Sequence, residues 1–191
     1  TDVVMWGRRP ELCEAVNRTH RNPDYLPDIE LPSAIRATPE PVEAAEGADL
    51  IVLAVPSQTL RANLTTWAPK LPEDVVPVSL MKGIELGTAK RMSEVISEVA
   101  GAGPGRVAVV SGPNLAGEIA QRQPAASVVA CADESVAQRI QHACHSPYFR
   151  PYTNTDVVGV ELGGIVKNII ALATGMAEGM GFGDNSKAAI I

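Results

Sequence analysis

The sequence predicts an α/β protein whose doubly wound, mostly parallel sheet is followed by the beginning of an all-α domain. Short β-rich runs alternate with helical stretches over residues 1–154, which is the pattern of parallel strands joined by crossover helices. The run LIVLAV at residues 50–55 is apolar at every position, as expected for a strand covered by helices on both faces. Beyond residue 154 the strand signals stop and a long helical stretch rich in small residues follows. We therefore divide the chain into residues 1–154 and 155–191.

Each expected element has a local reason in the sequence. Pro10 suits the first turn of a helix after the first strand, because the N–H that proline lacks would have no partner there. Residues 88–99 and 134–144 have the apolar spacing of amphipathic helices. Five of the 15 prolines lie between residues 22 and 41, which predicts a loop with at most one short strand. The expected strands cover residues 3–6, 50–55, 75–80, 107–111 and 127–131.

The strand at residues 3–6 is followed closely by two adjacent arginines, Arg8 and Arg9. In a nucleotide-binding sheet such a strand comes second, after a strand and a glycine-rich turn whose backbone N–H groups bind a pyrophosphate. The glycine clusters at residues 101–105 and 179–184 have the wrong order or spacing for that turn, so both are predicted to be connectors. We expect a sheet that lacks its first strand, and a helical domain that is incomplete at residue 191.

Composition argues against several classes of function. A formal net charge of −6 and a pI near 5.1 disfavour a nucleic-acid surface, which needs clustered lysines and arginines. Three cysteines without CxxC spacing predict neither a disulfide framework nor a zinc site, and they favour a reducing cytoplasm. His142 and His145 lack a nearby carboxylate, so no metal site is expected. The most apolar window, residues 165–177, contains Lys167 and Asn168 and is not expected to span a membrane.

Charged residues at strand ends are the first candidates for a binding site. An arginine after the second strand of a dinucleotide fold accommodates a 2′-phosphate, and the planar guanidinium of Arg8 or Arg9 suits that anion. Lys82 follows the strand at residues 75–80, and Gly112 and Asn114 follow the next one, all at the sheet edge where such folds bind ligands. The alternatives are solvated surface charges and, for Asn114, a simple helix cap.

Lys167 lies in a helical stretch that is otherwise almost entirely apolar or small. We therefore expect its charge to be buried or to face a cleft. Burial would lower the pKa of the lysine and make it a usable proton donor and acceptor near neutral pH. The alternative is a lysine whose aliphatic stem crosses apolar surface to reach water.

Five segments together carry a family resemblance. In this order and spacing, ADLIVLAVPSQ, SLMKGIE, VVSGPNLAGEIA, VELGGIVKNIIALATGM and GFGDNSKAAII closely resemble bacterial-type NAD(P)-dependent glycerol-3-phosphate dehydrogenases. The resemblance runs over essentially the whole chain. It implies a Rossmann-like NAD(P)-binding domain in residues 1–154, the start of a helical substrate domain in residues 155–191, and reversible reduction of dihydroxyacetone phosphate by NAD(P)H. The product, sn-glycerol 3-phosphate, would feed phospholipid synthesis in the cytoplasm.

The resemblance also implies roles for individual residues. Lys167 is similar to the catalytic lysine that gives a proton to the substrate carbonyl oxygen, and Asn168 would line the same pocket. Lys82 matches a lysine that contacts both substrate and cofactor, where its charge would stabilise the developing alkoxide. Gly112 and Asn114 fall on substrate-contacting positions. The family usually has Ser or Thr in place of Asn114, so an amide would replace a hydroxyl contact.

The cofactor side of the resemblance involves three further residues. Ala116 falls on a cofactor-contacting position, and Arg8 and Arg9 fall on the adenosine-phosphate site, which favours NADP over NAD. The glycine-rich loop of the family and its later substrate-site residues lie outside this sequence, so we expect little or no activity from the chain as given. A homodimer is compatible with the resemblance.

Two other functions remain open at this point. A related hydroxyacid or ketopantoate-type NADP reductase shares the architecture and a lysine on the interdomain helix, although SLMKGIE and GFGDNSKAA argue against it. A non-catalytic protein that binds NADPH or glycerol phosphate is the other alternative, and the presence of both Lys82 and Lys167 disfavours it.

Overall fold

The computed structural model describes residues 2–191, and these residues form a parallel two-stranded sheet and a mixed five-stranded sheet with helices around them. The strands are β1 (Val3–Trp6), β2 (Ile35–Thr38), β3 (Leu50–Leu53), β4 (Val76–Ser79), β5 (Ala108–Ser111), β6 (Ala125–Ala130) and β7 (Phe149–Asn154). The helices are α1 (Pro10–Thr19), α2 (Pro41–Ala45), α3 (Leu60–Trp67), α4 (Met92–Ala100), α5 (Ala116–Ala120), α6 (Glu134–Cys144), α7 (Val157–Gly179) and α8 (Asp184–Ile190). The predicted α/β class, with a helical stretch after the strands, is confirmed.

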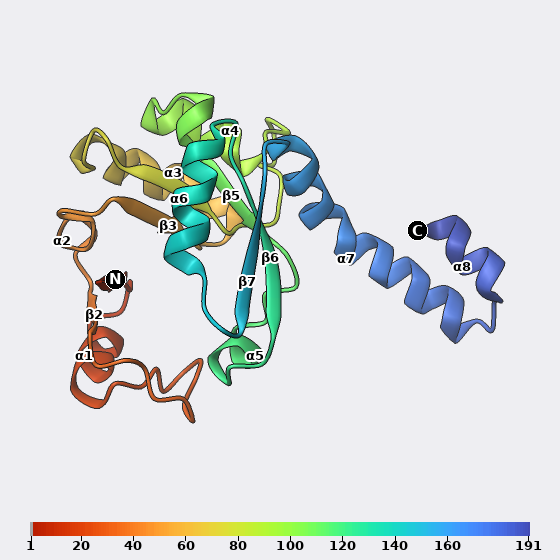
Figure 1. The fold of residues 1–191 in the computed structure, drawn as a ribbon, viewed down its shortest axis with the longest axis horizontal. Helices are drawn as coiled ribbons and strands as arrows, with labels where there is room; N and C mark the ends of the chain where they lie inside the picture. The colour runs from red at the N-terminus through yellow and green to blue at the C-terminus, as the bar shows by residue number, and fades with distance from the viewer. Residues whose placement is uncertain (1) are drawn as a thin grey trace.

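The strands lie in two groups (Figure 1). β1 and β2 form a parallel pair with Val3 opposite Ile35, and the order of the larger sheet is β3-β4-β5-β6-β7. Every pair in the larger sheet is parallel except β5–β6, in which Val110 lies opposite Val129. Among the described strands β1 pairs only with β2, and β3 pairs only with β4. This arrangement confirms the expectation of a mostly parallel sheet.

Helices cover both faces of the five-stranded sheet, as the doubly wound prediction requires. Successive residues of a strand point to opposite faces, so Val76 and Val78 pack with Ile140 of α6 on one face. On the other face, Leu53 of β3 packs with α3 and α4 in a second core. A third, smaller core lies between α1 and the β1–β2 pair, where Cys13, Val16 and Ala37 are buried.

The sequence analysis missed one strand of the sheet and placed the start of one helix too early. β7 was not predicted, because the sequence FRPYTN includes Pro151, which reads as a break in a strand. Proline is tolerated on an edge strand, and β7 forms one edge of the sheet. The helix predicted over residues 88–99 begins later, at Met92, because the preceding residues fold into a turn that is closed by a bridge between Ile84 and Arg91.

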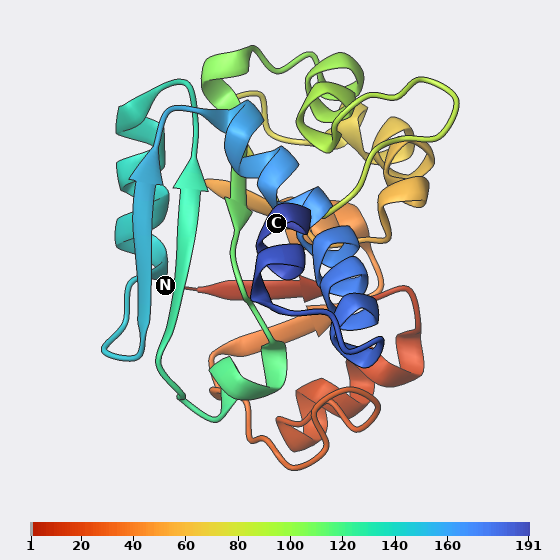
Figure 2. The ribbon, with the colours of Figure 1, turned by 90° about the vertical axis from the view of Figure 1, so that its right-hand side faces the viewer.

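α7 starts against the sheet and then runs away from it, with α8 folded back beside its far end (Figures 1 and 2). The apolar side chains Ile169, Leu172 and Met176 are therefore exposed. By length and composition α7 is apolar enough to cross a membrane. Its most apolar 18-residue segment has a mean hydropathy of 1.6, and 11% of that segment is buried in the structure. Such a single helix is weak evidence for a span.

Candidate active site

Lys82 and Gly112 meet at the carboxyl edge of the larger sheet. Lys82 lies three residues beyond β4, and Gly112 directly follows β5, so two parallel strands bring them together. The Nζ of Lys82 donates a hydrogen bond to the carbonyl oxygen of Gly112 over 2.8 Å. Burial lowers the pKa of Lys82, and the positive charge of Lys167 lowers it further. The two lysines that the sequence singled out therefore lie close enough to influence each other.

α7 brings Lys167 to this edge. The carboxylate of Asp156 caps the helix by accepting from the backbone N–H of Gly159 over 2.8 Å. A Cβ atom on Gly164 would lie 2.4 Å from Oγ of Ser111 and 3.6 Å from Cγ of Lys82, so α7 contacts the strand end and the lysine stem at this glycine. Lys167 follows one turn later.

Of the two expected settings of Lys167, burial or a cleft, burial is wrong, because the residue is exposed, as is Asn168. The physical reason is the path of α7, which leaves the sheet after Gly164 and turns its apolar sequence toward solvent. The alternative of a lysine whose charge reaches water is the one that the structure supports. Lys82 is exposed as well, although partial burial lowers its pKa.

The loop after β5 is held closely against β6. A Cβ atom on Gly112 would lie 3.0 Å from the carbonyl oxygen of Ala126 and 3.1 Å from Cα of Ser127, so the close backbone approach favours glycine there. Asn114 accepts a hydrogen bond from the hydroxyl of Ser127 through its side-chain oxygen. It is not a helix cap, since α5 starts later, after Leu115, and that alternative is wrong. Ala116 is the exposed first residue of α5.

Arg8 and Arg9 lie just beyond β1, which belongs to the two-stranded sheet, whereas Lys82 follows a strand of the five-stranded sheet. Arg8 is exposed. Arg9 forms an ion pair with Asp24 over 2.6 Å, and both side chains are more than two-fifths exposed. The hydrogen bond and charge of Asp24 raise the pKa of Arg9. The arginine pair thus lies at the carboxyl end of its strand, as predicted, with one guanidinium already engaged by a carboxylate.

Sequence reasoning missed Glu161, which is only 2% exposed. Its carboxylate accepts hydrogen bonds from the backbone N–H of Ser93, the hydroxyl of Ser93 and Nη1 of Arg91. The sequence does contain a signal for a buried carboxylate, because Glu161 is the only acidic residue in the apolar stretch VVGVELGGIV. Lys167, directly after this stretch, is a charged residue in the same apolar setting.

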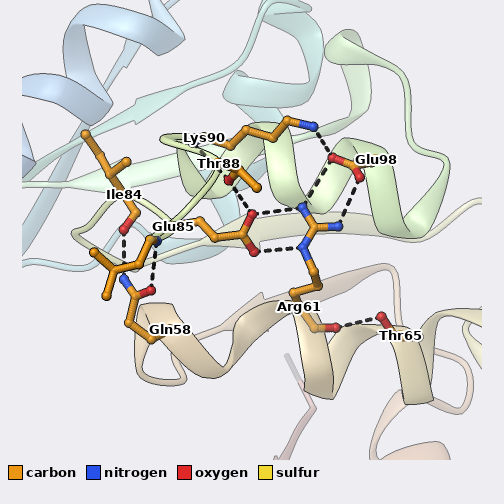
Figure 3. A network of polar contacts seen from close by, with 9 residues as sticks. Gln58, Arg61, Thr65, Ile84, Glu85, Thr88, Lys90 and Glu98 are labelled. Atoms are coloured by element: carbon orange, nitrogen blue, oxygen red, sulfur yellow. Dashed lines mark hydrogen bonds and ion pairs between the residues drawn. The ribbon is translucent and has the colours of Figure 1, made fainter.

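A second missed feature holds the loop between β4 and α4, which contains Lys82 (Figure 3). Arg61 of α3 forms two hydrogen bonds with Glu85, of 2.7 and 2.9 Å, and also pairs with Glu98 of α4. Gln58 bonds the backbone of the same loop, donating to Ile84 and accepting from Leu86. The charged and amide groups before and within α3 thus fix the loop between β4 and α4. Within residues 2–191 no group of three His, Cys, Asp or Glu side chains is arranged to hold a metal ion.

Comparisons with known proteins agree with this geometry. The family model "NAD-dependent glycerol-3-phosphate dehydrogenase N-terminus" matches residues 1–137, and the corresponding C-terminus model matches residues 156–191. A curated relative from Streptomyces griseus, named glycerol-3-phosphate dehydrogenase [NAD(P)+], is 67% identical over 190 residues. One from Mycobacterium tuberculosis with the same name and the suffix 2 is 60% identical over 190 residues. This chain is covered completely in both cases and spans 56% and 57% of the relatives' lengths.

Solved structures show the same fold. The glycerol-3-phosphate dehydrogenase structure from Coxiella burnetii is 31% identical with a TM-score of 0.86, covering 99% of this chain and 57% of its own. The Plasmodium falciparum structure is 30% identical with a TM-score of 0.91, covering 98% of this chain and 53% of its own. The family models, which together match most of the chain, show that it belongs to the NAD-dependent glycerol-3-phosphate dehydrogenase family.

Proposed function

We propose that this chain carries the cofactor-binding part and the two catalytic lysines of an enzyme that reversibly reduces dihydroxyacetone phosphate to sn-glycerol 3-phosphate with NADPH or NADH. The observation that carries the proposal is the convergence of Lys82 and Lys167, which come from separate parts of the chain to one edge of the sheet. Family membership supports the same reaction, and so do the names of the relatives. The alternative reductase and the non-catalytic binding protein are not favoured.

The residues present suit a dinucleotide that carries a 2′-phosphate. Arg8 and Arg9 lie at the carboxyl end of β1, and Lys82 lies beyond the carboxyl end of β4, which are the ends where such sheets bind ligands. We propose that Arg8 and Arg9 bind the 2′-phosphate and that Ala116 and Lys82 contact the nicotinamide end. Asp24 would have to release Arg9 or share it for this contact to form.

The chemistry of the protein side follows from charge and position. When bound, the reduced cofactor supplies a hydride to the substrate carbonyl carbon. Lys167 gives a proton to the carbonyl oxygen and takes it back in the reverse direction. Lys82 stabilises negative charge on that oxygen, and its bond to the carbonyl of Gly112 keeps the ammonium in place. Gly112, Asn114 and Asn168 would bind the substrate beside the two lysines.

The experiment uses a full-length hybrid, in which this chain replaces the matching 190 residues of the Streptomyces griseus relative. Oxidation of NADPH is followed with dihydroxyacetone phosphate for the parent hybrid, for Lys167→Ala, and for Lys70→Ala, an exposed lysine away from the site. We expect Lys167→Ala to lower kcat by about a hundredfold or more, since this is typical for loss of a general acid. We expect Lys70→Ala to match the parent.

Two results would contradict this function. The first is a folded parent hybrid that reduces only another keto substrate, such as a 2-keto acid. The second is a Lys167→Ala variant that keeps the parent rate.

Location and assembly are further proposals. Cys13, Cys131 and Cys144 are free thiols, and thiols remain reduced in the cytoplasm, which supports a cytoplasmic location. The contacts of Glu161 and Gly164 with the sheet domain support a role for α7 as a packed helix and not a membrane span. The acidic net charge supports a small-molecule substrate over nucleic acid. A homodimer stays a proposal, which sedimentation of the hybrid tests.

A further inference from the structure

Glu161 is a charged side chain buried at the junction between α7 and the sheet domain. Its side chain is 1% exposed, and it accepts hydrogen bonds from the backbone N–H of Ser93 over 2.9 Å, from the hydroxyl of Ser93 over 2.6 Å and from Nη1 of Arg91 over 3.0 Å. Ser93 and Arg91 lie about 70 residues earlier in the sequence, at the start of α4. All three bonds therefore join α7 to one point of another element.

That point is the end of the loop that contains Lys82. The loop runs from β4 to α4, so Lys82 lies near its start and Arg91 at its end. At its start, the Lys82 stem lies against Gly164 of α7, and at its end Arg91 and Ser93 bind Glu161 of the same helix. α7 thus contacts both ends of the loop through residues three positions apart, which lie on one face of a helix.

This arrangement links the position of Lys167 on α7 to the position of Lys82 in the loop. Lys167 follows Glu161 by six residues, which corresponds to about 9 Å along the helix axis. A rotation or axial shift of α7 would break the bonds of Glu161 and would also move Lys167 past Lys82. Burying a carboxylate is an inefficient way to stabilise a fold, because desolvation offsets most of the gain from its partners. These directional bonds instead fix the position of α7 relative to the start of α4.

We propose that Glu161 is a positioning residue, which fixes α7 against the start of α4 and so determines where Lys167 stands relative to Lys82. The proposal rests on the proposed function of the two lysines. It assigns to Glu161 no contact with substrate or cofactor.

Kinetics of the full-length hybrid give the first test. Glu161→Gln keeps the shape of the side chain but removes the charge that holds Arg91. We expect kcat for dihydroxyacetone phosphate to fall by about tenfold to a hundredfold, the scale of small misplacements of catalytic groups. The Kd of NADPH, measured by fluorescence titration, should change less than about twofold. The substitution alters the position of α7 but removes no contact with the cofactor.

Glu94→Gln is the matched control. Glu94 is a second carboxylate on the same Arg91, at 3.0 Å, but it belongs to α4 and its side chain is 47% exposed. Loss of its charge should leave kcat within about twofold of the parent, since α7 keeps its own contacts. Ser93→Ala is a milder variant for the case in which Glu161→Gln does not fold, and we expect an intermediate loss of kcat.

A second readout does not depend on activity. A short amine-reactive cross-linker is applied to the parent hybrid and the variants, and the Lys82–Lys167 link is quantified by peptide mass spectrometry. We expect the link in the parent and in Glu94→Gln, and a several-fold lower yield in Glu161→Gln or Ser93→Ala. An equal yield in all of them, or no link in the parent, overturns the positioning role. A parent that links normally but does not reduce dihydroxyacetone phosphate overturns the proposed function alone.

Discussion

At the residue scale, the two lysines reach the same edge of the sheet from different elements. Lys82 follows an apolar strand and Lys167 lies in an apolar helix, so the sequence pattern favoured burial of Lys167. In the structure both lysines are exposed, and partial burial of the Lys82 stem between the loop after β5 and α7 lowers the pKa of Lys82. Lys167 extends from a helix that has left the sheet. The pair therefore brings two exposed lysines from different elements to the same edge of the sheet.

Gly112 leads to the first residue-scale prediction. In Gly112→Ala the new Cβ meets the backbone of β6 at 3.0 Å, and this backbone has little freedom to move within the sheet. We expect the variant to lose about 1–3 kcal/mol of stability, as for other overpacked sites. The measurement is urea unfolding of the full-length hybrid.

Gly163→Ala serves as the control for that substitution. It adds the same methyl group on exposed α7, where nothing lies within 4 Å. Alanine is the better helix former, so the control should be as stable as the parent or more stable. Equal destabilisation by both changes would show that the close approach at Gly112 is unimportant.

The arginine pair leads to a second residue-scale prediction, on cofactor choice. Arg8→Ala combined with Arg9→Ala removes the two guanidinium groups proposed to bind the 2′-phosphate. We expect the Kd for NADPH to rise by about tenfold or more and the Kd for NADH to change much less, because only NADPH carries that phosphate. Fluorescence titration of the full-length hybrid with both cofactors measures this. Equal losses for the two cofactors would remove the 2′-phosphate role.

At the element scale, the loop from β4 to α4 is held by ion pairs as well as by its covalent ends (Figure 3). The pKa of Glu85 is lowered to about 2 by hydrogen bonds from Arg61 and Thr88. The pKa of Glu98 is likewise lowered to about 2 by hydrogen bonds from Arg61 and Lys90. Arg61 is the shared partner, so it couples α3 to both the loop and α4.

This coupling predicts a pH dependence of stability. Carboxyl groups whose pKa is lower in the folded state stabilise it fully above the unfolded value of 4.5. That contribution is lost as the pH falls from about 4.5 toward about 2. The stability gap between the full-length hybrid and its Arg61→Met variant should therefore be widest near pH 7 and shrink as the solution is acidified.

Urea unfolding at several pH values between 7 and 3 measures that gap. Arg36→Met, which changes an exposed arginine of β2, is the matched control and should show no such narrowing. A gap for Arg61→Met that stays constant down to pH 3 would show that the ion pairs of Figure 3 do not hold the loop in solution.

At the scale of the whole molecule, the two sheets have separate and unequal cores. The β1–β2 pair rests on the small core of Cys13, Val16 and Ala37, whereas the five-stranded sheet has two larger cores. The indole rings of Trp6 and Trp67 join the two parts edge to face, with centroids 4.7 Å apart. Among the described strands, none pairs with the second edge of β1 or with the second edge of β3.

These unequal cores predict unequal protection from hydrogen exchange. In the 191-residue chain the amides of β1 and β2 should exchange faster than those of β5 and β6, because fewer buried contacts oppose local opening. In the full-length hybrid the difference should narrow, since a first strand that pairs with β1 and β3 would join the sheets. Mass spectrometry of both proteins measures this. Equal protection of β1 in the two proteins would contradict it.

Local signals predicted most of the fold. The strand at residues 3–6 and the helix at 134–144 were predicted with their observed bounds, because apolar spacing and flanking residues mark them clearly. β7 was missed because its position at the sheet edge, which makes Pro151 acceptable, is a property of the assembled sheet. Both lysines are among the predicted site residues. For every one of these residues, contact with substrate or cofactor stays a prediction. The carboxylate of Glu161 was missed, since its partners lie about 70 residues away.

The sequence by itself determined the alternation of strands and helices, the placement of Lys82 and Gly112 after their strands, and the family to which the chain is similar. These follow from local periodicity and from short motifs, which neighbouring residues suffice to specify. Only the tertiary structure decided that the stem of Lys82 lies against α7, that Arg9 pairs with Asp24, and that Glu161 links α7 to α4. Desolvation and ion pairing depend on which distant surfaces come together, so they arise only when the chain is folded.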